Sequence, residues 1–393
     1  MIRPNNIRHA FLFISGSFLL ILNSCKKSST DNNSGGSTDP DPVAAVLNLP
    51  ATPFNYANPA LPAYLNNPGI AGQINTPGNN PITDNGATLG RVLFYDKNLS
   101  ANNTVACASC HKQSLGFTDN VVKSAGFNGG QTNRHSMGLT DAKYYPNGRF
   151  FWDQRAATLE DQVLRPIQDA VEMGMSLTDL VAKLKTKTYY PPLFKKAFGD
   201  ENITSERISL ALAQFVRSIV SYQTKFDAGR SQLPPGPLPP NPSFANFTAE
   251  ENRGLQLFFG PAGGCAGCHG TETFTAPSEK NNGLDLTTTD AGFGAVSGNP
   301  ADNGLFKVGS LRNIELGAPY MHDGRFATLE QVVEHYSSGV KAHPNLSPQL
   351  KLPNGQPRLT NFTAADKAAM VAFLKTLTDQ AMVTDVKYAN PFK

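Results

Sequence analysis

The chain has 393 residues, 40% of them hydrophobic and 17% charged, so it can bury a sizeable core and is not disordered throughout. A formal net charge of +3 gives no electrostatic reason to expect nucleic acid as a partner. Five cysteines are an odd number, which argues against a framework made of disulfides alone.

The N-terminus has the pattern of an export signal. Two arginines precede an apolar run over residues 10–22, which is too short for a comfortable membrane span. The Leu-Asn-Ser-Cys sequence that ends at Cys25 resembles a lipoprotein signal peptidase site, and an ordinary secretory signal is the alternative. We predict a lipoprotein signal peptide over residues 1–24 and a lipid anchor on Cys25. The protein would then be exported, on the periplasmic or cell-surface side, and anchored to the membrane.

Two stretches of biased composition predict linkers. Residues 25–50 begin with a polar run of low complexity, as expected of a flexible tether. Residues 233–245 contain six prolines and predict a semi-rigid linker. The predicted domains are therefore residues 51–232 and residues 246–393.

The remaining four cysteines form two copies of one motif. The copies are Cys107-Ala-Ser-Cys110-His111 and Cys265-Ala-Gly-Cys268-His269. The C-x-x-C-H pattern attaches c-type haem, because each thiol adds to a haem vinyl group and the histidine then binds the iron. Zinc sites and redox-active cysteine pairs are the alternatives, but zinc is closed by four ligands and each cluster supplies three in a row. The sequence predicts two covalent haems, with His111 and His269 as iron ligands.

Each motif lies between predicted helices. Thr248 begins a capping box and a helix ahead of the second motif, and Thr363 begins a helix that follows it. Residues 85–95 and 204–222 occupy the same places around the first motif. Few stretches alternate with a period of two. We expect a mainly α fold of two cytochrome c-like domains, each with one covalently bound c-type haem and long loops.

An internal repeat relates the two halves downstream of each motif. Residues 152–160 (WDQRAATLE) and 322–330 (HDGRFATLE) match at six of nine positions. Each copy predicts a threonine N-cap ahead of a helix, and an Asp and an Arg that pair or contact haem propionates. The copies differ where the first has Trp152, the only tryptophan, and the second has His322.

These features together resemble the bacterial di-haem cytochrome c peroxidases and their MauG-like branch. Besides the haem motifs, the matching segments are residues 149–160, 166–167, 171–174, 311–313 and 318–324. The resemblance implies that the N-terminal haem is peroxidatic and that the C-terminal haem relays electrons to it. It also implies catalytic roles for Trp152, between the haems, and for Glu172, as the distal carboxylate that moves a proton during peroxide cleavage.

The same resemblance bears on the second axial ligand of the C-terminal haem. The typical peroxidases carry a methionine where this chain has Tyr336, and the MauG branch has tyrosine there. A phenolate favours oxidised iron. Tyr336 is therefore the expected ligand, with His335, Met321 and a tyrosine packed in the core as alternatives. His322 is either an inter-haem or propionate contact or a buried histidine.

Two departures from the typical peroxidases matter. Residues 126–133 contain no histidine where those enzymes carry one that caps the first haem, which implies an open site at rest. His135 stands where an asparagine helps to bind a calcium ion between the haems. One calcium ion therefore remains an open expectation, with the carbonyls of Gly317 and Pro319 as its remaining ligands.

We expect an oxidoreductase of the cytochrome c peroxidase type, in class EC 1.11.1. It would reduce hydrogen peroxide to water with electrons from a small redox protein of the cytochrome c or cupredoxin type. One alternative is a MauG-like, peroxide-dependent oxidation of residues in a partner protein, which Tyr336 favours. The other is a non-catalytic electron-transfer cytochrome, against which Glu172 argues.

Overall fold

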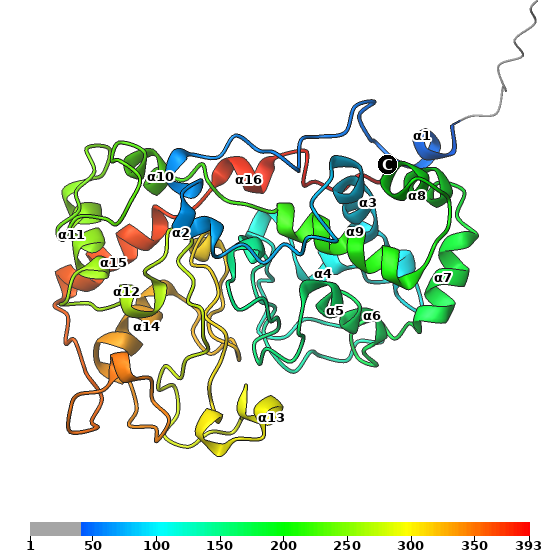
Figure 1. The fold of residues 1–393 in the computed structure, drawn as a ribbon. Helices are drawn as coiled ribbons and strands as arrows, with labels where there is room; N and C mark the ends of the chain where they lie inside the picture. Colours follow the sequence, from blue (N-terminus) through cyan, green and yellow to red (C-terminus); the bar gives the residue numbers. More distant parts are fainter. Residues whose placement is uncertain (1–40) are drawn as a thin grey trace, which may run out of the picture. The chain divides into compact units, whose positions relative to one another are not determined.

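The structure, a computed structural model, describes residues 41–393 (Figure 1). The predicted signal peptide and Cys25 lie outside the described residues, as do residues 26–40 of the predicted tether. Within the described part, the chain is mainly helical and pairs its backbone only in isolated bridges, with no sheet, which confirms the expected class. No helix in residues 41–393 is long and apolar enough to cross a membrane.

In the first half of the chain, two long helices pack against each other. α3 (Asp84–Tyr95) and α9 (Ser205–Ser218) begin after Thr83 and Thr204, and each threonine oxygen accepts a hydrogen bond from a backbone N–H of the first turn. Both predicted helices are confirmed, but α9 ends before residue 222. It ends early because the backbone N–H of Ser221 donates to Asp141 instead of continuing the helix.

A matching pair forms the second half. α11 (Ala249–Phe259) starts with the predicted capping box between Thr248 and Glu251, and α15 (Ala364–Lys375) starts after the predicted cap Thr363. Short helices carry the haem motifs themselves, α4 (Cys107–Cys110) and α12 (Ala266–His269). The remaining α-helices are α1 (Pro42–Val46), α2 (Pro68–Ala71), α5 (Leu159–Gln162), α6 (Arg165–Gln168), α7 (Leu177–Lys185), α8 (Tyr190–Phe198), α10 (Lys225–Arg230), α13 (Gly294–Ser297), α14 (Leu329–Glu334) and α16 (Gln380–Thr384).

Both helix pairs cross at a glycine. A Cβ atom on Gly90 of α3 would lie 2.0 Å from the carbonyl oxygen of Ala211 in α9. A Cβ atom on Gly254 of α11 would lie 2.0 Å from the carbonyl oxygen of Ala369 in α15. No side chain fits at that distance, so glycine is what lets each pair of backbones approach (Figure 1).

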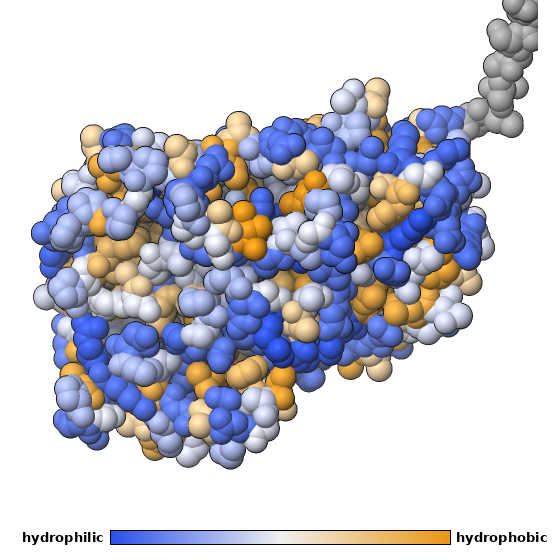
Figure 2. Space-filling model, viewed as in Figure 1, coloured by the Kyte–Doolittle hydropathy of each residue, from blue (hydrophilic) through white to orange (hydrophobic). Residues whose placement is uncertain are grey.

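The buried hydrophobic residues form two main clusters. One includes Phe94 of α3 and Phe215 of α9, and the other includes Phe258 of α11 and Phe373 of α15. The chain after α15 returns to the first cluster, where Tyr388 is buried. On the face seen in Figure 2, hydrophobic residues form separate patches among hydrophilic ones.

The internal repeat has the same local structure in both halves. Antiparallel bridges join Phe150 to Ala156 and Tyr320 to Phe326, so each copy begins with a small hairpin. Helices follow at the predicted threonines, but the first copy stops after one turn, at Gln162. Pro166 lacks the N–H that would bond to the Gln162 carbonyl, so the helix cannot continue through it.

Candidate functional site

A first cavity holds the first C-x-x-C-H motif. Cys107, Cys110 and His111 line it, and so does Glu172 from the loop between α6 and α7. The loop over residues 126–133 contributes Gly126, Gln131, Thr132 and Asn133 to its wall.

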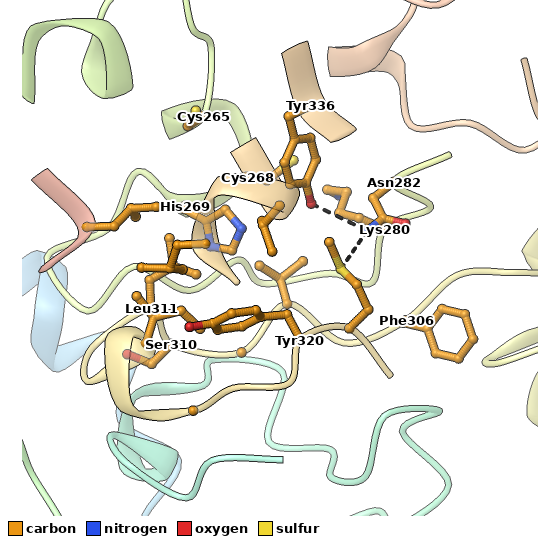
Figure 3. A pocket seen from close by; sticks show the side chains of 18 of the residues that line it. Cys265, Cys268, His269, Lys280, Asn282, Phe306, Ser310, Leu311, Tyr320 and Tyr336 are labelled. Carbon is orange, nitrogen blue, oxygen red and sulfur yellow. Dashed lines mark hydrogen bonds between the residues drawn. The ribbon is translucent and has the colours of Figure 1, made fainter. Parts of the chain in front are cut away.

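A second cavity holds the second motif (Figure 3). Cys265, Cys268 and His269 line it together with Tyr336, whose hydroxyl points toward Asn282. The Asn282 side-chain N–H donates to the Tyr336 oxygen over 3.4 Å. Burial raises the pKa of Tyr336 to about 12, so the hydroxyl keeps its proton unless a cation such as ferric iron binds its oxygen.

The two motif histidines are oriented in the same way. His111 Nδ1 lies 3.0 Å from the carbonyl oxygen of Phe117, and His269 Nδ1 lies 2.9 Å from that of Phe274. Both phenylalanines have a left-handed backbone, with φ of 63° and 57°, which turns each carbonyl back toward its histidine. Burial lowers the pKa of both imidazoles. A neutral ring that donates from Nδ1 keeps its Nε2 lone pair for a metal.

The four motif cysteines are free thiols. Burial raises the pKa of Cys107 and of Cys265 to about 12. Each cysteine pair and its histidine therefore present two protonated thiols and one oriented nitrogen to one cavity.

A tight turn fixes Glu172. Asp169 Oδ1 accepts hydrogen bonds from the backbone N–H groups of Val171 and Glu172, at 2.8 and 3.0 Å. Gly174 follows with φ of 62°, and a Cβ atom there would lie 2.4 Å from the ring of Phe127. Burial, with the nearby negative charge of Asp169, raises the pKa of Glu172 to about 7. The carboxyl group can thus accept or release a proton near neutral pH.

Trp152 lines both cavities. Its indole N–H donates to the carbonyl oxygen of His135 over 2.8 Å. His322 packs edge-on against it, with ring centroids 6.4 Å apart, and stacks on Phe306 at 3.8 Å. His322 is buried and lines the second cavity, so an aromatic group stands at this repeat position in both halves.

The structure separates the three residues considered as axial ligands. Tyr336 and Met321 line the second cavity, and the Met321 sulfur lies 3.5 Å from the Asn282 side-chain nitrogen. His335 does not line it, because its ring lies against the backbone oxygen of Asn282, at 3.0 Å from Nε2.

The helix that begins after Thr328 turns one face, with i, i+3, i+4 and i+7 spacing, toward the second cavity. Leu329, Val332, Val333 and Tyr336 all line the second cavity. The α-helix ends at Glu334, however, and residues His335–Gly339 form a π-helix (η7) that carries Tyr336. The wide turn could not be read from side-chain periodicity, and such turns are frequent at functional sites.

Comparison with known proteins decides the family. A model described as di-haem cytochrome c peroxidase matches residues 84–232. The methylamine utilization protein MauG of Methylorubrum extorquens is 36% identical over 301 residues, which is 76% of this chain and 79% of that protein. The chain belongs to the di-haem cytochrome c peroxidase family. It is an oxidoreductase that acts on peroxide.

Further relatives agree with the assignment to this family. The cytochrome c551 peroxidase of Nitrosomonas europaea is 34% identical over 301 residues, which is 74% of this chain and 79% of that protein. The crystal structure of a MauG-like protein associated with microbial copper homeostasis superimposes with a TM-score of 0.73 at 32% identity, covering 85% of this chain and 99% of that one. The family implies two c-type haems, hydrogen peroxide as substrate and a redox partner, and its members are periplasmic c-type cytochromes.

The residues of this peroxidase fit two c-type haems. Each cavity supplies a pair of free thiols and a histidine whose Nδ1 lies against a backbone carbonyl oxygen, which leaves Nε2 as the nitrogen that would bind iron. That donor set is the one covalent haem attachment needs.

The His135 side chain itself offers no ligand to a calcium ion. The His135 ring lies 3.0 Å from the carbonyl oxygen of Val121 and 3.3 Å from the hydroxyl of Thr118, so both nitrogens have protein partners. Calcium takes oxygen ligands, which an imidazole does not supply. The described residues hold no group of three His, Cys, Asp or Glu side chains suited to a metal. A calcium ion at this place would depend on the carbonyl oxygens of Gly317 and Pro319.

Sequence reasoning did not identify most of the charged residues around the first cavity. The predicted pair within the repeat is present, with Arg155 Nη1 3.0 Å from Asp153. Arg134 also binds Asp153, at 2.6 Å, and Asp290, at 2.8 Å. Lys307 lines both cavities, and its only signal is a lysine within the short apolar run around Phe306.

Proposed function

We propose that this di-haem peroxidase reduces hydrogen peroxide to water with electrons from a small redox protein of the cytochrome c or cupredoxin type. The observation that carries the proposal is Glu172, a carboxyl group with a pKa of about 7 in the cavity that also holds His111. Cys107, Cys110 and His111 hold the peroxidatic haem, and Cys265, Cys268 and His269 hold the electron-receiving one.

When bound, the first haem supplies the iron at which the O–O bond is cleaved. Glu172 would accept the proton of one peroxide oxygen and deliver it to the other, which would leave as water. A pKa near 7 suits both transfers, since the group is neither too weak a base nor too weak an acid at neutral pH. Two electrons and two further protons complete the reduction of one peroxide to two waters.

Trp152 is the proposed contact between the two haems, because it lines both cavities. The hydrogen bond from its indole N–H to His135 holds the ring in place. Electrons that enter at the second haem would pass this side chain on the way to the first.

The test is Glu172→Gln, which keeps the size of the side chain and removes its acid–base function. We expect both haem spectra to be unchanged and kcat for peroxide to fall by about 10²–10⁴-fold. Glu250→Gln, an exposed acid in α11, is the control and should turn over like the wild type. A Glu172→Gln enzyme with the wild-type kcat would remove this residue from the reaction.

A MauG-like oxidation of residues in a partner protein is the second candidate, and Tyr336 favours it. Its hydroxyl reaches into the second cavity, where we propose that it ligates the second haem as phenolate. Phenolate stabilises oxidised iron, so the all-ferric protein should react with peroxide without a reductant and change the bands of both haems. Tyr336→Met should then need prior reduction by one electron. If the wild-type ferric protein did not react with peroxide, the MauG-like candidate would be contradicted and the ordinary peroxidase cycle would remain.

The spectrum of the oxidised protein separates both enzymes from a plain electron carrier. We expect one high-spin haem, since no histidine lies in residues 126–133 to cap the first iron, and one low-spin haem. Two low-spin haems would favour the carrier. The proposed haem domains are residues 51–232 and 246–393, exported and tethered through lipid on Cys25.

A further inference from the structure

Lys307 is a buried cation at the junction of the two cavities. Its side chain lines both of them, and only 7% of the residue is exposed. The ammonium nitrogen lies 4.0 Å from the ring centroid of Tyr145 and 4.2 Å from that of Phe150. Its backbone N–H donates to the carbonyl oxygen of Trp152 over 2.8 Å, which fixes Lys307 beside the residue that both cavities share.

The ammonium group has no anionic partner among the residues that the structure describes. Burial alone lowers the pKa of Lys307, to about 7, with no opposite charge acting against it. The two aromatic faces attract a cation, but they offset only part of its lost hydration. Without an anion the amine is partly neutral near pH 7, and a carboxylate placed beside it would restore its full positive charge.

The other cations of the first cavity are already neutralised. Arg134 is held by Asp153 and Asp290, and Arg155 by Asp153. Three cationic side chains line this cavity, and Lys307 is the one among them without a carboxylate. Each haem carries two propionate groups, which bring carboxylates into the cavity that receives it.

We propose that Lys307 is a shared counter-ion for the propionates of both haems, placed where their cavities meet, and that its charge raises the reduction potential of both. This inference rests on the proposed binding of two haems. The electrostatic reason is direct: reduction adds a negative charge to each haem, and a fixed cation within the low-dielectric interior stabilises the reduced form. Lys307 is a positioning residue in this scheme, since it acts on the haems through their carboxylates.

The test is a redox titration of the purified holoprotein, with each haem followed by its own absorption band. Lys307→Met should lower the reduction potentials of both haems, and Lys307→Arg, which keeps the charge, should restore them toward the wild type. Lys280→Met is a matched control, because Lys280 lines only the second cavity, where its ammonium group donates to Ser278 over 2.6 Å. It should leave the first haem unchanged. Lys143→Met, at a half-buried lysine that lines neither cavity, should shift neither haem.

A shift confined to one haem in Lys307→Met contradicts the shared role, and no shift at either haem contradicts the whole inference. A crystal structure of the wild-type holoprotein decides the case even where that variant fails to fold. We expect the ammonium nitrogen within about 4 Å of a propionate oxygen of each haem; a nitrogen that contacts neither would overturn the proposal. A haem assay separates this from the proposed function, because fewer than two haems per wild-type chain would contradict that function itself.

Discussion

At the scale of single residues, the properties of Glu172 come from its neighbours. Its place was predicted from a short motif that includes Met173 and Gly174. Its raised pKa was not, because that depends on burial and on Asp169, which the turn brings beside it. For Tyr336, too, the sequence predicts one property and the folded structure determines the others. Its inward direction follows from helical spacing, whereas the π-helix and the contact with Asn282 depend on the folded chain.

The turn around Glu172 gives a prediction for pH dependence. A base must be ionised to accept the proton of peroxide, so kcat/KM for peroxide should rise with pH through about 7. Asp169→Asn keeps an oxygen for the two backbone N–H groups but removes a negative charge that raises the pKa of Glu172. The rising limb of the pH–rate profile should therefore move to lower pH.

Two outcomes of this pH–rate measurement would contradict the prediction. If Asp169→Asn left the limb in place while Glu172→Gln abolished it, the titrating group would be Glu172 but the charge of Asp169 would not tune it. If neither variant changed the limb, another group would govern the reaction with peroxide.

At the scale of helices, threonine caps made the long elements predictable. Thr204, Thr248 and Thr363 each begin a helix as the sequence indicated. The sequence predicted the helix ends less well, because contacts with residues distant in the sequence determine where a helix stops. Asp141 takes the N–H of Ser221 beyond the end of α9, and no local pattern announces that contact.

The glycine crossings give a prediction for stability. Gly254→Ala adds one methyl group 2.0 Å from the Ala369 carbonyl oxygen, so α11 and α15 must move apart. Such overpacking costs about 1–3 kcal/mol, which exceeds the gain of up to about 1 kcal/mol from replacing glycine within a helix. The denaturation midpoint of the holoprotein should fall.

Glu250→Ala on the exposed side of α11 serves as the reference for this measurement, since it changes helix propensity without touching α15. A Gly254→Ala protein more stable than the wild type would mean that the two helices are not packed as closely as described.

At the scale of the whole molecule, we predict that lipid on Cys25 attaches the protein to a membrane. Cys25→Ala should release the protein in soluble form with both haems retained, because the four motif cysteines are untouched. Fractionation and a haem assay measure the two properties. Loss of one haem from this variant would show that Cys25 serves haem attachment instead of lipidation.

The matching hairpins, Phe150 to Ala156 and Tyr320 to Phe326, suit a tandem duplication of an ancestral single-haem unit. Both copies kept the bend and the Asp–Arg pair within it. Each also kept a glycine crossing and a carbonyl that orients the haem histidine. Among the positions that differ, Trp152 in one copy faces His322 in the other, and each side chain lines a cavity. Two descendants of one unit would thus differ in chemistry on hairpins of the same shape.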